Sequence, residues 1–133
     1  NAFGIINKKN VTSLSKNYIE KFKIILTSGR QLIEELSGGN QQKCIISKWL
    51  LSNPSILILD EPTRGVDIGV KSEMYDIIKQ LSQNGTAIIL ISSELPEILS
   101  LAHRIVVMRE GHISNTLDHK NASQEIIMQN AIN

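Results

Sequence analysis

The sequence reads Ile-Leu-Ile-Leu-Asp-Glu-Pro at residues 56–62, and this stretch indicates the class of fold. A short, continuous apolar run is typical of a strand that is buried on both faces of a parallel sheet. Ligands of such sheets bind outside the carboxyl ends of the strands. We therefore expect Asp60 and Glu61, which end the run, to carry chemistry.

The residues that follow alternate between helical and strand patterns. The expected elements are a helix at 70–82, a buried strand at 87–91, a short helix from Pro96 to about Leu101, a strand at 105–108, an edge-like strand at 112–116 and a closing helix at 122–131. The order strand, helix, strand, helix, strand predicts right-handed crossovers and a parallel sheet. The chain is therefore expected to be an α/β protein whose first three strands share one sheet.

Two further helices are expected before the apolar run. Residues 13–26 place apolar side chains at helical spacing, with Ser13 or Ser15 as a possible cap. Residues 40–52 have the same periodicity, and Trp49 lies on their apolar face. This pattern predicts that Trp49 packs into the core.

The most specific string is Leu-Ser-Gly-Gly-Asn-Gln-Gln-Lys at residues 36–43. Ser37, Gly38 and Gly39 at a helix start leave backbone N–H groups accessible to an anion, and the helix dipole favours negative charge there. This pattern predicts an anion-binding site that a phosphate group can approach closely. A simple N-cap followed by a glycine turn is the alternative, and both readings stay open for Ser-Gly-Gly in isolation.

Residues 36–43, taken together with Asp-Glu-Pro-Thr at 60–63, resemble the signature loop and the Walker B motif of ABC-type ATPases. The resemblance covers residues 31–133 well. It implies an α/β fold: a partial P-loop NTPase (RecA-like) core with parallel strands and flanking helices, plus a remnant of the ABC helical subdomain. The implied domains are residues 1–43, the remnant that ends in the signature loop, and residues 44–133, the C-terminal part of the ATPase core.

The resemblance also implies a role for individual residues. Asp60 would hold Mg²⁺, and Glu61 would polarise the water that attacks ATP. Ser93 stands where the family usually places a histidine that contacts the γ-phosphate, so Ser93 is a second candidate catalytic residue, without a cationic ring. The residues implied in nucleotide binding are Ser37, Gly38, Gly39, Asn40, Gln41, Asp60 and Asp67.

The family's head-to-tail dimers imply a division of these residues between two nucleotide sites. Each signature loop caps the ATP that the opposite half holds, whereas Walker B serves the ATP of its own half. Gly65-Val66-Asp67 resembles the D-loop, in which the aspartate helps to join the two sites. The signature loop would thus complete the other half's site, while Asp60, Glu61 and Ser93 would line this half's own.

Four strings are similar to one subgroup of the family, the second ATPase half of bacterial monosaccharide importers of the ribose and galactose type. They are Gln-Gln-Lys at 41–43, Glu-Pro-Thr-Arg-Gly-Val-Asp at 61–67, Ser-Ser-Glu-Leu-Pro-Glu at 92–97 and Ala-Ser-Gln-Glu at 122–125. This resemblance implies that ATP hydrolysis energises sugar import at the cytoplasmic face of the inner membrane. The implied partners are the opposite ATPase half, membrane permease subunits and, indirectly, a periplasmic sugar-binding protein.

One motif of the family is missing, because the chain has no Gly-x-x-x-x-Gly-Lys-Ser/Thr string. Residues 65–72 are a near miss with the wrong spacing and without the preceding strand. The phosphate loop is expected to precede Asn1. The full-length protein is therefore expected to be an ATPase and translocase, and the isolated chain to be inactive.

Two alternatives to a transport ATPase stay open. One is a soluble ABC ATPase of translation or repair, although that branch typically reads Glu-Pro-Thr-Asn-His-Leu-Asp where this chain has residues 61–67. The other is an inactive fragment that lacks the phosphate loop.

Composition narrows the possible partners and the compartment. The formal net charge is +1 with both signs spread along the chain, which argues against nucleic acid as a partner. No apolar stretch reaches the roughly 20 residues that span a bilayer. Cys44 is the single cysteine, so an internal disulfide is impossible, which fits a reducing compartment such as the cytoplasm. Cys44 is expected to pack into the core.

Overall fold

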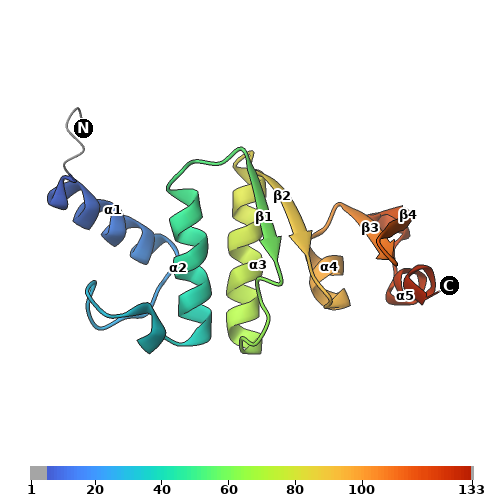
Figure 1. Cartoon of the computed structure of the whole chain (residues 1–133), viewed down its shortest axis with the longest axis horizontal. Coiled ribbons are helices and arrows are strands. Elements are labelled where there is room, and N and C mark those ends of the chain that lie inside the picture. The colour runs from blue at the N-terminus through green and yellow to red at the C-terminus, as the bar shows by residue number, and fades with distance from the viewer. Residues whose placement is uncertain (1–5, 133) are drawn as a thin grey trace. The chain divides into compact units, whose positions relative to one another are not determined.

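The computed structural model describes residues 6–132. They form the helices and strands labelled in Figure 1. By their contacts they divide into two compact units, whose segments alternate along the chain. Unit 1 contains the residues up to Pro54 together with Thr63–Met74, and unit 2 contains Ser55–Pro62 together with the residues from Tyr75 onward. Within residues 6–132, no helix is both long enough and apolar enough to cross a bilayer.

Unit 1 begins with α1 (Lys8–Lys21), followed by the short 3-10 helix η1 (Ile33–Glu35). The predicted helix start at Ser13 or Ser15 is wrong, because Asn7 caps the helix: its Oδ1 accepts from the backbone N–H groups of Lys9 at 3.0 Å and Asn10 at 3.3 Å. A side-chain oxygen at this position satisfies amides that have no partner within the helix. The predicted end at residue 26 is also wrong, since Lys23 adopts a positive φ of 49°.

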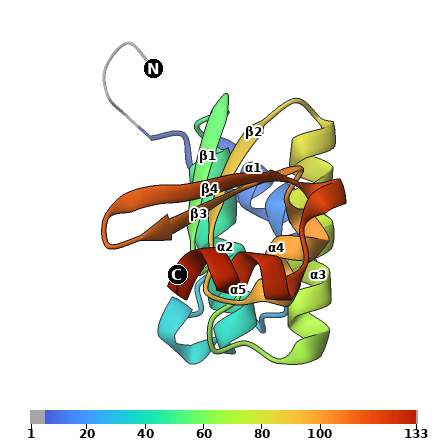
Figure 2. The same cartoon turned by 90° about the vertical axis from the view of Figure 1, so that its right-hand side faces the viewer.

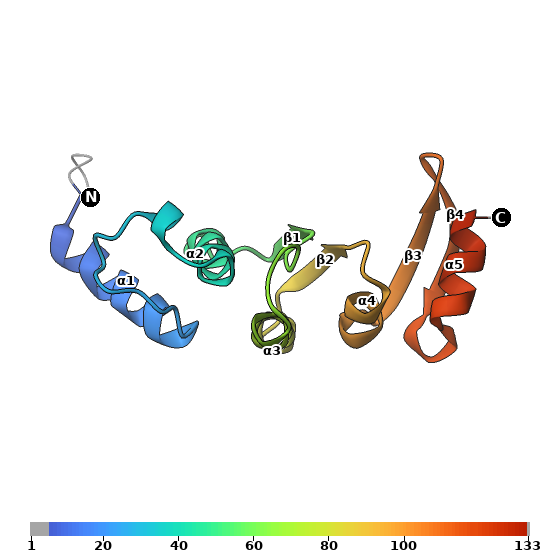
Figure 3. The same cartoon turned by 90° about the horizontal axis from the view of Figure 1, so that it is seen from below.

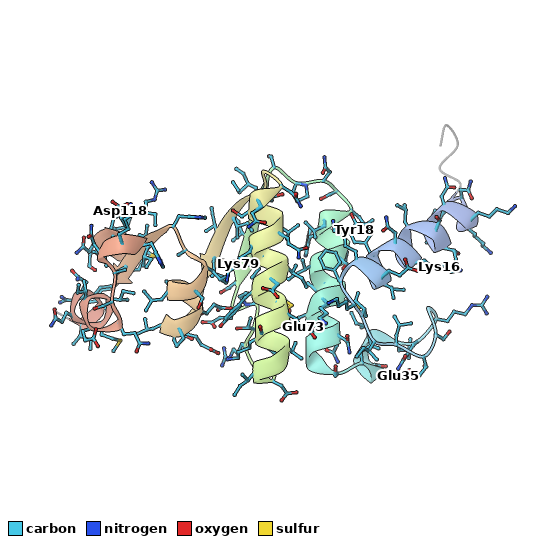
Figure 4. All side chains as sticks on the ribbon, turned by 180° about the vertical axis from the view of Figure 1, so that it is seen from behind. Lys16, Tyr18, Glu35, Glu73, Lys79 and Asp118 are labelled. Atoms are coloured by element: carbon cyan, nitrogen blue, oxygen red, sulfur yellow. The ribbon has the colours of Figure 1, made fainter. Side chains whose placement is uncertain are left out.

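The central helix of unit 1 is α2 (Gly38–Leu50). Its buried residues are Gly39, Lys43, Ile46, Ser47 and Leu50, which follow the spacing of one helical face. Trp49 lies outside this face and is 57% exposed, so the prediction that it packs into the core is wrong. Tyr18 of α1 donates from its hydroxyl to the carbonyl of Leu50 at 3.4 Å and thereby links α1 to the end of α2 (Figure 4).

Unit 2 contains the predicted parallel strands, β1 (Ile56–Asp60) and β2 (Ala87–Ile91). They pair in register from Ile56 with Ala87 to Asp60 with Ile91. The connection between them is α3 (Ile68–Gln83), whose second half covers one face of this sheet with Ile77, Ile78 and Leu81 (Figure 3). The predicted α/β arrangement with parallel strands and flanking helices is confirmed.

Burial on both faces of β1 is a wrong prediction. Leu57 and Leu59 are buried, whereas Ile56 and Ile58 on the other face are 59% and 63% exposed. The physical reason is that the described part of the chain supplies a helical cover to one face of the sheet, so alternate side chains of β1 face solvent.

The remaining elements of unit 2 are α4 (Leu95–Leu101), β3 (Arg104–Arg109), β4 (His112–Asp118), the 3-10 helix η2 (His119–Asn121) and α5 (Gln124–Ile132). β3 pairs antiparallel with β4 and not with the parallel strands, so its predicted place in the parallel sheet is wrong (Figure 2). Glu110 and Gly111 both have positive φ, 48° and 80°, which favours a tight two-residue hairpin. The core under the hairpin is formed by Ile105, Val107 and Ile127.

Candidate functional site

The carboxyl end of β1 places two acids in succession. Asp60 is the last residue of the strand and is exposed. Glu61 follows with a φ of 46°, a conformation that residues other than glycine rarely adopt. Its backbone N–H donates to the carbonyl of Ile91, the last residue of β2, at 2.8 Å. Such strain costs free energy and persists only where neighbouring contacts hold it, as they do here.

The Glu61 side chain is held by the segment that directly follows β2. Its Oε1 accepts a hydrogen bond from the backbone N–H of Ser93 at 2.9 Å. The structure therefore brings the two predicted catalytic residues into direct contact. The contact uses the Ser93 backbone rather than its hydroxyl, so no side-chain pattern in the sequence could have indicated it.

In unit 1, side-chain amides brace the predicted signature loop. Asn40 donates from Nδ2 to the Ser37 hydroxyl at 2.9 Å, and its Oδ1 accepts from the backbone N–H of Ile25 at 2.9 Å. Gln41 donates from Nε2 to the carbonyl of Leu36 at 2.9 Å. Ser37 precedes α2 without capping it through its side chain. The first backbone amides of α2 are thus left without a side-chain cap, in the positive field of the helix N-terminus.

The two glycines of the signature loop lie in different surroundings. A Cβ at Gly38 would meet one atom within 4 Å, the carbonyl oxygen of Gly65 at 3.9 Å. A Cβ at Gly39 would instead overlap the side chain of Val70. Gly38 therefore leaves room for a ligand above the helix, whereas Gly39 is required by packing within the protein.

Asp67 lies in unit 1 with the signature loop, directly before α3, and is exposed. A turn precedes it, in which Val66 N–H donates to the carbonyl of Thr63 at 3.3 Å and Gly65 has a φ of 74°. The Asp67 carbonyl accepts the first helical bond, from Lys71 N–H at 2.9 Å.

The predicted site residues thus fall into two sets. Unit 1 contains Ser37, Gly38, Gly39, Asn40, Gln41 and Asp67, and unit 2 contains Asp60, Glu61 and Ser93. The predicted domain boundary between residues 43 and 44 lies inside the continuous helix α2 and remains a prediction.

Both sets have the donor chemistry that a magnesium–nucleotide complex requires. The uncapped amides of α2 and the open space over Gly38 suit a phosphate oxygen. Asp60 offers one exposed carboxylate, and Mg²⁺ is commonly bound through one or two carboxylates plus substrate phosphates and water. Among residues 6–132, no group of three or more His, Cys, Asp or Glu side chains is arranged to hold a metal ion.

Sequence comparison shows which family part of the chain resembles. The family model described as ABC transporter matches residues 6–64. This match covers less than half of the chain, and the signature and Walker B strings predicted a similarity to the same family.

The chain is also similar, over nearly its whole length, to curated sugar-import ATP-binding proteins. The chain is 46% identical over 132 residues to the ribose import ATP-binding protein RbsA of Clostridium tetani, a match that covers 99% of this chain and 26% of the relative. It is 48% identical over 126 residues to the protein of the same name from Lactococcus lactis, covering 95% of this chain and 26% of the relative. The chain therefore spans about a quarter of the length of these curated relatives.

Solved structures agree on the fold. The dimeric bacterial ABC transporter cassette MJ0796 superposes with a TM-score of 0.76 at 19% identity, covering 87% of this chain and 50% of that one. The ABC transporter cassette MJ1267 superposes with a TM-score of 0.80 at 22% identity, covering 97% of this chain and 53% of that one. The predicted ABC ATPase fold is confirmed, as part of a larger cassette. MJ0796 is also known in a dimeric state bound to ADP and Pi.

Proposed function

We propose that this chain is the C-terminal part of the second ATPase half of a bacterial monosaccharide importer of the ribose or galactose type. Similarity to ribose import ATP-binding proteins over nearly the whole chain supports the proposal. The structural observation that carries it is Glu61, whose carboxylate is fixed by the Ser93 backbone at the carboxyl end of two parallel strands.

In the proposed reaction, each residue set has its own task. Glu61 orients and polarises the attacking water, and Ser93 holds the Glu61 carboxylate in place. Asp60 is the candidate ligand of Mg²⁺. When bound, Mg²⁺ would neutralise negative charge on the phosphates. Ser37, Gly38 and Gly39 present α2 amides to the ATP of the opposite half, and Asn40 and Gln41 keep that loop in shape. Asp67 lies beside the boundary between the two halves.

The proposed setting is the cytoplasmic face of the inner membrane, where the ATPase would act peripherally on permease subunits fed by a periplasmic sugar-binding protein. Residues 1–43 would be the retained part of the helical subdomain and residues 44–133 the ATPase core. The alternatives, a soluble ATPase of translation or repair and an inactive fragment, find no support among the relatives, which are import ATP-binding proteins.

Titration calorimetry with Mg-ATP tests this proposal. The full tandem polypeptide should bind Mg-ATP, whereas the 133-residue chain should not, because it contains no phosphate-loop string. Tight binding by the isolated chain would mean that it contains a phosphate site outside the signature and Walker B motifs. Absence of binding by the full polypeptide would overturn the ATPase proposal.

A further inference from the structure

Lys43 is the last residue of the signature string, and its side chain is 4% exposed. A buried ammonium group is costly unless it is paired. Lys43 forms an ion pair with Glu73 of α3 and also donates to the carbonyl of Lys23 at 3.4 Å. One side chain of α2 thus joins the turn that follows α1 and the first part of α3, all within unit 1.

Glu73 is the accessible partner of this pair, with a side chain that is 51% exposed. Figure 4 shows Glu73 on α3, on the side that faces α2. The Lys43 hydrogen bond and its charge hold the pKa of the Glu73 carboxyl below its ordinary value. Glu73 therefore stays ionised opposite the buried ammonium group at neutral pH.

A second contact joins the same two helices about one turn away. Gly39 lies one turn before Lys43, and Val70 lies one turn before Glu73. A side chain at Gly39 would overlap Val70, so the two backbones approach closely there. The first residue of α2 also lies near the turn that precedes α3, since a Cβ at Gly38 would lie 3.9 Å from the Gly65 carbonyl oxygen.

We infer that Lys43 and Glu73 form a positioning pair that fixes the signature loop relative to Asp67, so that both move as one body. The inference rests on the proposed function, in which both segments act at the nucleotide site completed with the opposite half. Two contacts along two rigid helices set both their separation and their register, which one contact would not. Lys43 and Glu73 are positioning residues, because neither needs to touch the nucleotide.

The test compares single variants with a double variant in the full-length polypeptide. Lys43→Met and Glu73→Gln each break the pair, and Glu73→Gln also leaves a buried charge without its partner, which destabilises the fold. The double variant Lys43→Met/Glu73→Gln removes both charges, so its melting temperature should return toward that of the unmodified protein. Its kcat for ATP should stay reduced by roughly 10- to 100-fold, because the loops are no longer held together. Nucleotide binding should be unchanged.

Lys48→Met is the matched control, because Lys48 is an exposed cation on the same helix. It should leave both kcat and melting temperature unchanged. Recovery of kcat together with stability in the double variant would overturn the inference and assign the pair a purely structural role. Lack of ATP turnover by the unmodified polypeptide would instead contradict the proposed function, so the two failures are distinguishable.

Discussion

Among the candidate site residues, Glu61 has the most tightly restricted side chain. Its positive φ, its backbone bond to Ile91 and its side-chain bond to Ser93 all restrict where the carboxylate can lie. We expect Glu61→Gln in the full-length polypeptide to lower turnover at this half's site by roughly 10²- to 10⁴-fold, the usual scale for one catalytic base. The rate of phosphate release under single-turnover conditions measures this loss of turnover.

Ser93→Ala is the matched comparison for Glu61→Gln. The backbone N–H that holds Glu61 remains in this variant, so turnover should fall by less than in Glu61→Gln. Equal losses would show that the Ser93 hydroxyl is as important as the Glu61 carboxylate. Unchanged transport in Glu61→Gln would mean that this half's own site contributes little.

Gly38 and Gly39 should respond differently to substitution. Gly38→Ala has room within the protein, so it should lower ATP turnover without lowering the melting temperature. Gly39→Ala overlaps Val70 and should lower stability by about 1–3 kcal/mol, as overpacked sites do. The companion substitution Val70→Ala should restore stability. If turnover in Gly39→Ala/Val70→Ala stays low while stability returns, Gly39 also contributes to the phosphate site.

Glu73 makes stability depend on pH in a defined direction. Because its folded-state pKa is lowered, the pair with Lys43 stabilises the fold above the ordinary carboxyl range, and this contribution is lost as pH falls through the folded-state pKa. The melting temperatures of the unmodified chain and Glu73→Gln should therefore differ at neutral pH and converge on acidification. Glu34→Gln, at an exposed position, is the control. A difference that is constant with pH would argue against the ion pair.

For helix α2, the sequence pattern predicted the presence of the helix correctly but not which of its residues are buried. The apolar periodicity of residues 40–52 predicted this helix, and Pro54 predicted that it ends nearby. The helix has more apolar residues than one face can bury, so periodicity does not decide which of them are buried. Tertiary packing buries Ile46 and Leu50 and leaves Trp49 exposed. The buried Lys43 could not have been anticipated from a hydrophobic pattern, because its partner is thirty residues away in the sequence.

Because Ile46 lies on the buried face of α2 and Trp49 does not, their replacement by alanine should affect stability unequally. Ile46→Ala should destabilise the 133-residue chain by about 2–5 kcal/mol, since Ile46 is 3% exposed. Trp49→Ala should change stability by about 0.5 kcal/mol or less, as exposed positions do. Urea unfolding followed by circular dichroism gives both values. A larger loss for Trp49→Ala would mean that the described face is wrong.

The chain as a whole leaves apolar surface exposed. In unit 2, the uncovered face of the parallel sheet carries Ile56, Ile58, Ile89 and Ile91, each about half exposed or more. Contiguous apolar patches on a protein surface commonly mark contact with another surface. In the curated relatives, this region is about a quarter of a longer polypeptide.

The isolated chain should therefore self-associate and bind an apolar dye more strongly, per mole, than the full tandem polypeptide does. Sedimentation velocity over a range of concentrations tests the first expectation, and dye fluorescence tests the second. Replacing Ile58 by Thr should reduce both signals, whereas Thr at Ser72, an exposed position of unit 1, should not. A concentration-independent monomer without dye binding would contradict the prediction.

The succession of strands and helices, the family resemblance and the candidate site residues could all be predicted from local patterns. Apolar runs, glycine turns and the strings at 36–43 and 60–63 act within a few residues, where propensity and hydrogen-bonding chemistry are set by neighbours in the chain. Burial and pairing depend instead on contacts between segments distant in sequence. The exposed face of β1, the Ser93 amide on Glu61 and the Lys43–Glu73 pair all depend on such contacts, and spatial packing alone selects them.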